Sequence, residues 1–120
     1  MSSPLWTRGV LARGAFAVAL LVSFVVLFAP GSDVPAAPAG VDKVVHFSLF
    51  AVLAATGRWA GVRRGLLAGC LVVYAALSEL LQGIPALHRD PAVGDWLADA
   101  AGTLGGLLLT DGLGRRRRTR

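Results

Sequence analysis

The sequence predicts an all-α protein, a bundle of four transmembrane helices with both termini in the cytoplasm. Hydrophobic residues make up 55% of the 120 residues and charged residues 16%, whereas soluble domains carry roughly 25% charged residues. Four apolar runs are separated by segments that contain proline, glycine or arginine. Basic residues gather at one set of run ends, and acids and histidines gather at the other. A chain that crosses a bilayer repeatedly shows this pattern.

The expected spans cover residues 10–29, 44–60, 65–84 and 92–113 of one domain, and a basic tail follows at 114–120. The first run reaches the roughly 20 residues that a spanning helix needs, and Pro30 and Gly31 end it. Arg63 and Arg64 separate the second run from the third. The two prolines of the loop GIPALHRDP end the third run, because proline cannot continue a helix. The fourth run is apolar and glycine-rich in its second half.

The cations define the expected topology. Ten of the twelve fall in segments that would be cytoplasmic, and only Lys43 and Arg89 do not. Because basic loops stay inside, the ends that carry acids and histidines would face outward. The expected partners are the lipid bilayer and, at the arginine-rich ends, anionic headgroups. Nucleic acid is not an expected partner despite a pI near 11.1, because RNP-type motifs and zinc-finger spacings are absent.

The start of the chain permits a second interpretation. Arg8 and Arg13, the apolar core and the small-residue stretch VPAAPAG resemble a secretory signal with a cleavage site. Cleavage within residues 1–40 would leave the new N-terminus outside, so the orientation of the other three spans would not change. The apolar stretch is longer than a usual signal core, which favours a retained span.

Three of the expected helices each carry a polar pair near the outer surface. Spacings of three or four residues place both members of a pair on one helical face. Charges within a span are costly, so we expect the pairs to face one another across the bundle. The pairs are Asp42 with His46, Glu79 with Gln82, and Asp95 with Asp99. The alternative for acids such as Asp42 is simple contact with headgroups and water.

Neighbouring residues would complete this cluster. Asp42 would orient His46, and Arg89 would pair with Glu79 or Asp95 or clamp an anionic headgroup, unless it is a loop arginine in water. Gly102 and Gly106 continue the face of the fourth helix on which the acids lie, and they favour close helix packing. Converging acids and histidine can ligate a divalent metal. However, no HExxH or HxxxD signature is present, so we predict no metal and no cofactor.

Two stretches carry a resemblance to a known family: VDKVVHFSLFAVLA at 41–54 and YAALSELLQGIPALHRDPAVGDWLADAAGTLGG at 74–106. Together with the order of the helices, they resemble the VanZ-like family of small bacterial membrane proteins. The family pattern falls on Asp42, Lys43, His46, Phe47, Glu79, Gln82, Arg89, Asp95 and Gly102. Asp99 stands where the family has asparagine, which adds a negative charge. The resemblance implies four helices in the bacterial cell membrane and a connection with the cell envelope, which extends to glycopeptide (teicoplanin) resistance in the family's namesake.

Three functions follow from the outward cluster. The first is non-enzymatic binding of an envelope lipid or peptidoglycan precursor, favoured because no complete nucleophile or metal signature is present. The second is an intramembrane enzyme acting on a lipid-linked substrate, with His46 as base, Asp42 as its orienter, Glu79 as acid and Arg89 as anion clamp. The third is a proton-coupled carrier, for which four short helices leave little room to alternate access.

Cysteine labelling tests the topology. In a Cys70→Ala background, we expect an impermeant thiol reagent on intact cells to label cysteines at Ser32 and Ala92, which would lie outside. A cysteine at Thr119 should react only after the cells are broken open. Labelling of Thr119 in intact cells would contradict a cytoplasmic C-terminus.

Overall fold

Four α-helices and no strand make up the described part of the chain. The computed structural model describes residues 5–28, 40–82 and 93–118, with their side chains except at 5–8, 42, 82, 93 and 113–118. The helices are α1 (Leu5–Phe28), α2 (Val41–Trp59), α3 (Arg64–Gln82) and α4 (Val93–Arg118). For these residues the predicted all-α class and the four helices are confirmed. The last helix runs five residues beyond the predicted apolar stretch, because arginine is a good helix former.

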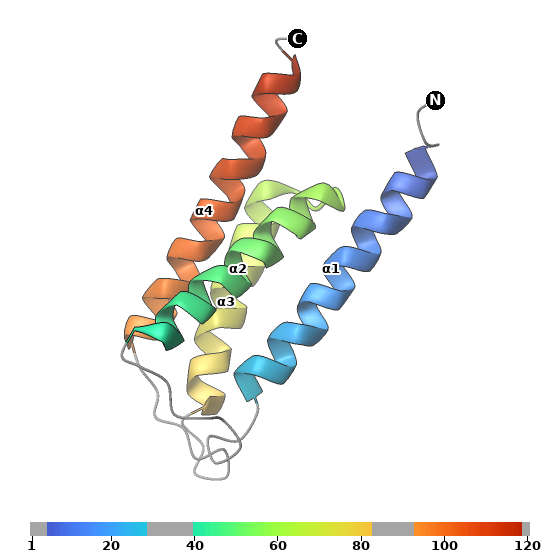
Figure 1. The fold of residues 1–120 in the computed structure, drawn as a ribbon. Coiled ribbons are helices and arrows are strands. Elements are labelled where there is room, and N and C mark those ends of the chain that lie inside the picture. The colour runs from blue at the N-terminus through green and yellow to red at the C-terminus, as the bar shows by residue number, and fades with distance from the viewer. Residues whose placement is uncertain (1–4, 29–39, 83–92, 119–120) are drawn as a thin grey trace.

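The helices run in alternating directions (Figure 1). The start of α1, the turn between α2 and α3, and the end of α4 lie toward one end of the bundle. The end of α1, the start of α2, the end of α3 and the start of α4 lie toward the other. α2 and α3 lie between α1 and α4, and the most extensive packing joins α2 to α4.

The turn from α2 to α3 is a Schellman motif. The amide of Val62 donates to the carbonyl of Gly57 and the amide of Gly61 to that of Arg58, each at 3.0 Å. Gly61 has a φ of 92°, which an L side chain rarely adopts, so glycine suits this position. The guanidinium of Arg58 donates from Nη1 to the Val62 carbonyl at 2.8 Å and holds the corner.

An apolar core fills the interior between α1, α2, α3 and α4. Its buried members are Leu27, Phe50, Leu53, Ala54, Leu67, Leu71, Ala75 and Leu107. Tyr74 of α3 links this core to α1 and α2. Its ring centroid lies 5.5 Å from that of Phe24 and 5.7 Å from that of Phe50, and its hydroxyl lies 2.8 Å from Ser23 Oγ. The serine is fully buried, so this contact satisfies a polar group inside the apolar interior.

Two glycines bring α4 against the backbone of α2. A Cβ added at Gly102 would collide with the Phe47 carbonyl, and one added at Gly106 would collide with the Ala51 carbonyl. Because the two glycines are four residues apart, they lie on the same face of α4. Small residues at this spacing allow helices to approach closely, and here they set the separation of α2 and α4.

Among the described residues, two helical stretches are long and apolar enough to cross a membrane, Gly9–Phe28 and Arg64–Leu81. A core helix of a soluble protein, or a signal sequence in the case of α1, has the same properties. Of the four spans predicted from the sequence, α1 and α3 are thus candidates by length and composition. α2 and α4 carry more charge, since α2 includes Asp42, Lys43 and Arg58 and α4 includes three aspartates before its arginines.

We predict that Gly102→Ala and Gly106→Ala destabilise the bundle. Alanine favours a helix over glycine by about 1 kcal/mol, but here its methyl group would force apart two backbones, and overpacking typically costs about 1–3 kcal/mol. Gly112→Ala is the matched control, because nothing lies near a Cβ at that position of α4. Thermal unfolding of the detergent-solubilised protein, followed by circular dichroism, should show lower midpoints for the first two variants only. Equal midpoints for all three would mean that the glycines do not set the approach.

Candidate functional site

Buried ionisable side chains from three helices meet near the end of the bundle where α2 and α4 begin. His46 comes from α2, Glu79 from the last turn of α3, and Asp95 and Asp99 from the first two turns of α4. Their exposed fractions are 1%, 7%, 6% and 0%, respectively. We call these four residues the acid/histidine cluster. Burial of charged groups costs free energy unless they are paired, so the cluster is an unusual feature in so apolar a chain.

The imidazole of His46 lies between two carboxylates of α4. Its Nδ1 is 2.7 Å from Asp99 Oδ1, a hydrogen bond in which the imidazole N–H donates. Its Nε2 is 3.7 Å from Asp95 Oδ2. The two aspartates are four residues apart and therefore lie on one face of α4, which places one of them on each side of the ring. Gly102, one turn further along α4, allows the helices to come close enough for this contact.

Glu79 approaches the same point from α3. Three buried residues, His46, Glu79 and Asp99, each offer one atom that could bind a metal. These three atoms lie within 4.8 Å of one another. Ala75, one turn deeper on α3, is fully buried. The neighbouring Ser78 donates to the Ala75 carbonyl at 2.8 Å, so its hydroxyl is satisfied within its own helix.

Lys43 lies at the outer side of the cluster. Its Nζ is 3.6 Å from Asp95 Oδ1, and its side chain is 56% exposed whereas that of Asp95 is 8% exposed. The aliphatic part of Lys43 passes over Gly94, where an added Cβ would lie 2.8 Å from Lys43 Cε. Asp95 therefore contacts an exposed ammonium with one oxygen and faces the buried imidazole with the other.

The structure brings together five of the eight residues predicted for the polar cluster: Lys43, His46, Glu79, Asp95 and Asp99. Asp42 and Gln82 belong to α2 and α3, but their side chains fall outside the described residues, as does Arg89 entirely. The sequence paired His46 with Asp42 on its own helix, whereas the described partner at Nδ1 is Asp99 on α4. A local spacing rule cannot identify that contact, because it joins residues 53 positions apart.

One polar contact had no signal in the sequence analysis. Ser23 and Tyr74 join α1 to α3 through a buried hydrogen bond of 2.8 Å. Both residues stand alone in apolar runs, where a serine or tyrosine by itself indicates nothing.

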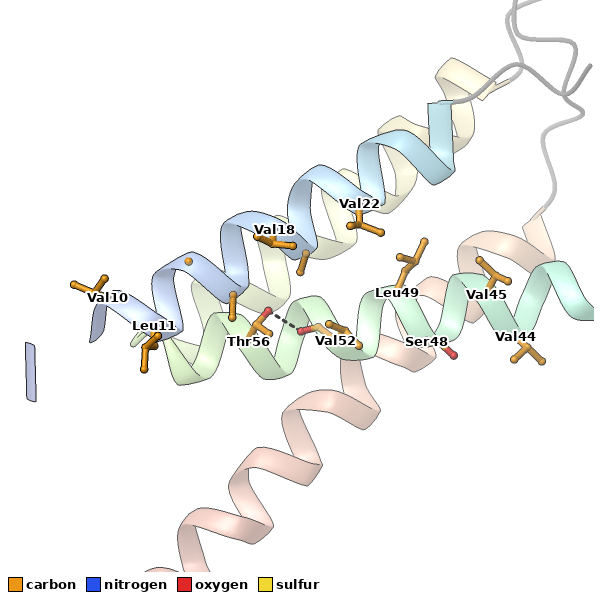
Figure 2. Close-up of a pocket in the computed structure, with 13 residues that line it drawn as sticks. Val10, Leu11, Val18, Val22, Val44, Val45, Ser48, Leu49, Val52 and Thr56 are labelled. Atoms are coloured by element: carbon orange, nitrogen blue, oxygen red, sulfur yellow. Dashed lines mark hydrogen bonds between the residues drawn. The ribbon is translucent and has the colours of Figure 1, made fainter. Parts of the chain in front are cut away.

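A separate apolar groove lies between α1 and α2 (Figure 2). It measures about 900 Å³. Its walls include Val18 and Val22 of α1, and Leu49 and Val52 of α2. No residue of the acid/histidine cluster lines it. One side of α2 therefore contributes His46 to the cluster with α3 and α4, and another side lines the apolar groove.

Comparisons with protein-family models, with curated proteins and with solved structures gave no match to this chain. The chemistry of the cluster therefore rests on its own geometry. A buried imidazole surrounded by three carboxylates can hold a proton between nitrogen and oxygen, or it can bind a cation. An excess of carboxylates favours positively charged ligands.

Proposed function

We propose that this chain is a VanZ-like protein of the bacterial cell membrane that crosses the bilayer four times. The distribution of polarity supports the proposal. Among the described side chains, twenty-two large apolar ones are exposed, while the buried residues include His46, Glu79 and Asp99. Exposed apolar surface of this extent indicates contact with lipid or with another protein, and buried ionisable residues in a span face the bundle interior.

The helix lengths also suit a bilayer. α2 and α3 have 19 residues each, which corresponds to about 28 Å at 1.5 Å per residue, close to the roughly 30 Å of the hydrocarbon core. α1 and α4 are longer. With alternating helix directions, the start of α1, the end of α4 and the arginine-containing α2–α3 turn share one side, which would be cytoplasmic. The acid/histidine cluster would then lie toward the outside.

We further propose that the acid/histidine cluster is the functional site and that it binds a component of the cell envelope, an envelope lipid or a peptidoglycan precursor. The observation that carries this is the convergence of His46, Glu79 and Asp99 from three helices into one buried group. Charged residues in a span are expensive and mark functional sites by default. The VanZ-like resemblance of the same residues supports an envelope role that extends to glycopeptide resistance.

The contact between His46 and Asp99 also favours a second candidate, an intramembrane enzyme on a lipid-linked substrate. An imidazole oriented by a carboxylate at 2.7 Å is the arrangement of a general base, and Glu79 would supply the acid. Asp99, rather than Asp42, would orient the base. If this candidate is correct, replacing His46 alone should make a lipid substrate accumulate in membrane extracts. If the chain only binds the lipid, the same replacement should leave the lipid composition of the extracts unchanged.

We predict that Glu79→Ala abolishes the envelope function and leaves membrane insertion intact. Removing a charge from a span eases insertion, so loss of activity would report on the site. The measurement is teicoplanin sensitivity in a strain that lacks the wild-type copy, alongside the amount of protein in the membrane fraction. Leu80→Ala is the matched control on the same helix, because Leu80 is 72% exposed. A fully active Glu79→Ala protein would exclude the cluster as the functional site.

A further inference from the structure

The sequence predicts no metal, because it lacks a metal-binding signature, but the packing of three helices brings metal-ligating side chains together. We propose that His46, Glu79 and Asp99 bind one divalent transition-metal ion. This inference rests on the proposed function, since it takes the same cluster as the functional site, and it names the cation that the cluster holds. The three residues offer one imidazole nitrogen and two carboxylate oxygens, from three different helices. An ion bound there would join α2, α3 and α4 at a single point.

The spacing of the donor atoms suits one ion. The three ligand atoms lie within 4.8 Å of one another. Bond lengths near 2.1 Å from Zn²⁺ to nitrogen or oxygen place two tetrahedral ligands about 3.4 Å apart. Side-chain rotations that move the donors by roughly 1 Å would therefore complete the site. For His46 and Asp99 the backbones are already close, because Gly102 and Gly106 hold α4 against α2.

The charge of the acid/histidine cluster favours a cation. A ligating imidazole is neutral, so three ionised carboxylates and the ammonium of Lys43 give these five side chains a summed charge of −2. Lys43 contacts Asp95 at the outer side of the cluster and is largely exposed. Its charge therefore contributes little to neutralising Glu79 and Asp99. Glu79 and Asp99 are 7% and 0% exposed, and buried charges are retained where they are paired or coordinate metals. A divalent ion would neutralise both.

The donor set discriminates between metals. Ca²⁺ and Mg²⁺ prefer sites made of oxygen ligands, whereas imidazole suits zinc, copper, iron and nickel. The chain has a single cysteine, Cys70, which is exposed and does not belong to the cluster. One nitrogen with two carboxylates, and with Asp95 adjacent as a further oxygen donor, favours a first-row transition ion over an alkaline-earth ion.

The second layer of contacts would orient the donors. Asp99 is fixed on α4 next to the Gly102 contact, and Thr103 Oγ1 donates to the Asp99 carbonyl at 2.9 Å. Asp95 lies between exposed Lys43 and buried His46, at 3.6 Å and 3.7 Å from them. Such outer carboxylates commonly tune metal-ligating histidines.

The test is Zn²⁺ binding by the full-length protein, purified in detergent and stripped with a chelator. We expect one zinc ion per chain by calorimetry and by metal analysis after desalting, and no displacement by a tenfold excess of Mg²⁺. His46→Gln, Glu79→Gln and Asp99→Asn should each weaken zinc binding at least 100-fold. Asp111→Asn is the matched control, since Asp111 lies on α4 but pairs with Arg64 at 2.8 Å, outside the cluster. It should change the zinc affinity less than twofold.

Co²⁺ gives a second readout, because its visible absorption reports the coordination geometry and should disappear in His46→Gln. Wild-type protein that takes up no zinc, or that binds Mg²⁺ equally well, would overturn the proposal. So would folded His46→Gln and Asp99→Asn proteins with wild-type zinc affinity. If a variant loses its helical circular dichroism, the wild-type comparison of Zn²⁺ with Mg²⁺ decides.

The two proposals fail separately. A wild-type protein that binds no zinc, together with an inactive Glu79→Ala variant, would reject the metal and keep the envelope function. Zinc binding lost in Glu79→Gln, together with a fully active Glu79→Ala variant, would keep the metal site and reject the functional role.

Discussion

The buried hydrogen bond between His46 and Asp99 is the interaction on which the arrangement of this bundle depends. Both side chains are almost fully excluded from solvent, and breaking a buried ionic pair by removing one partner typically costs about 3–5 kcal/mol. The contact can form only if α2 and α4 approach until their backbones nearly touch. Gly102 and Gly106 permit this approach. The two glycines and the acid/histidine cluster therefore depend on the same close approach of α2 and α4.

The same close approach of α2 and α4 buries ionisable side chains and leaves large apolar side chains exposed. His46 and Asp99 are buried together with core residues such as Phe50, whereas Val44 and Leu104 are exposed. A soluble bundle would expose the cluster and bury those residues. In lipid, the observed arrangement satisfies both groups, because the apolar surface meets acyl chains while ionisable side chains meet one another.

Much of this could be predicted from the sequence, for identifiable reasons. Four helices could be predicted from the apolar runs and from the prolines that end them, at Pro30 and in the loop after Gln82. These signals depend only on residues that are close together in the sequence. The i, i+4 spacing of Asp95 and Asp99 predicted their common face for the same reason. The partner of His46 could not be predicted, since Asp42 and Asp99 are equally suitable acids until the packing of α2 on α4 selects between them. The link between Ser23 and Tyr74 likewise depends on how α1 and α3 are placed.

The packing beneath the cluster limits what the cluster can do. Continuing from His46 along α2, Phe50, Leu53 and Ala54 are fully buried. From Glu79 along α3 in the opposite chain direction, the buried residues are Ala75, Leu71 and Leu67. At the far end, Arg64 and Asp111 form a second, more exposed ion pair at 2.8 Å. The cluster and the Arg64–Asp111 pair are thus separated by a mainly apolar interior, which also holds the hydroxyl pair of Ser23 and Tyr74. If the chain spans the membrane as proposed, this separation favours a site that works from one side over a carrier.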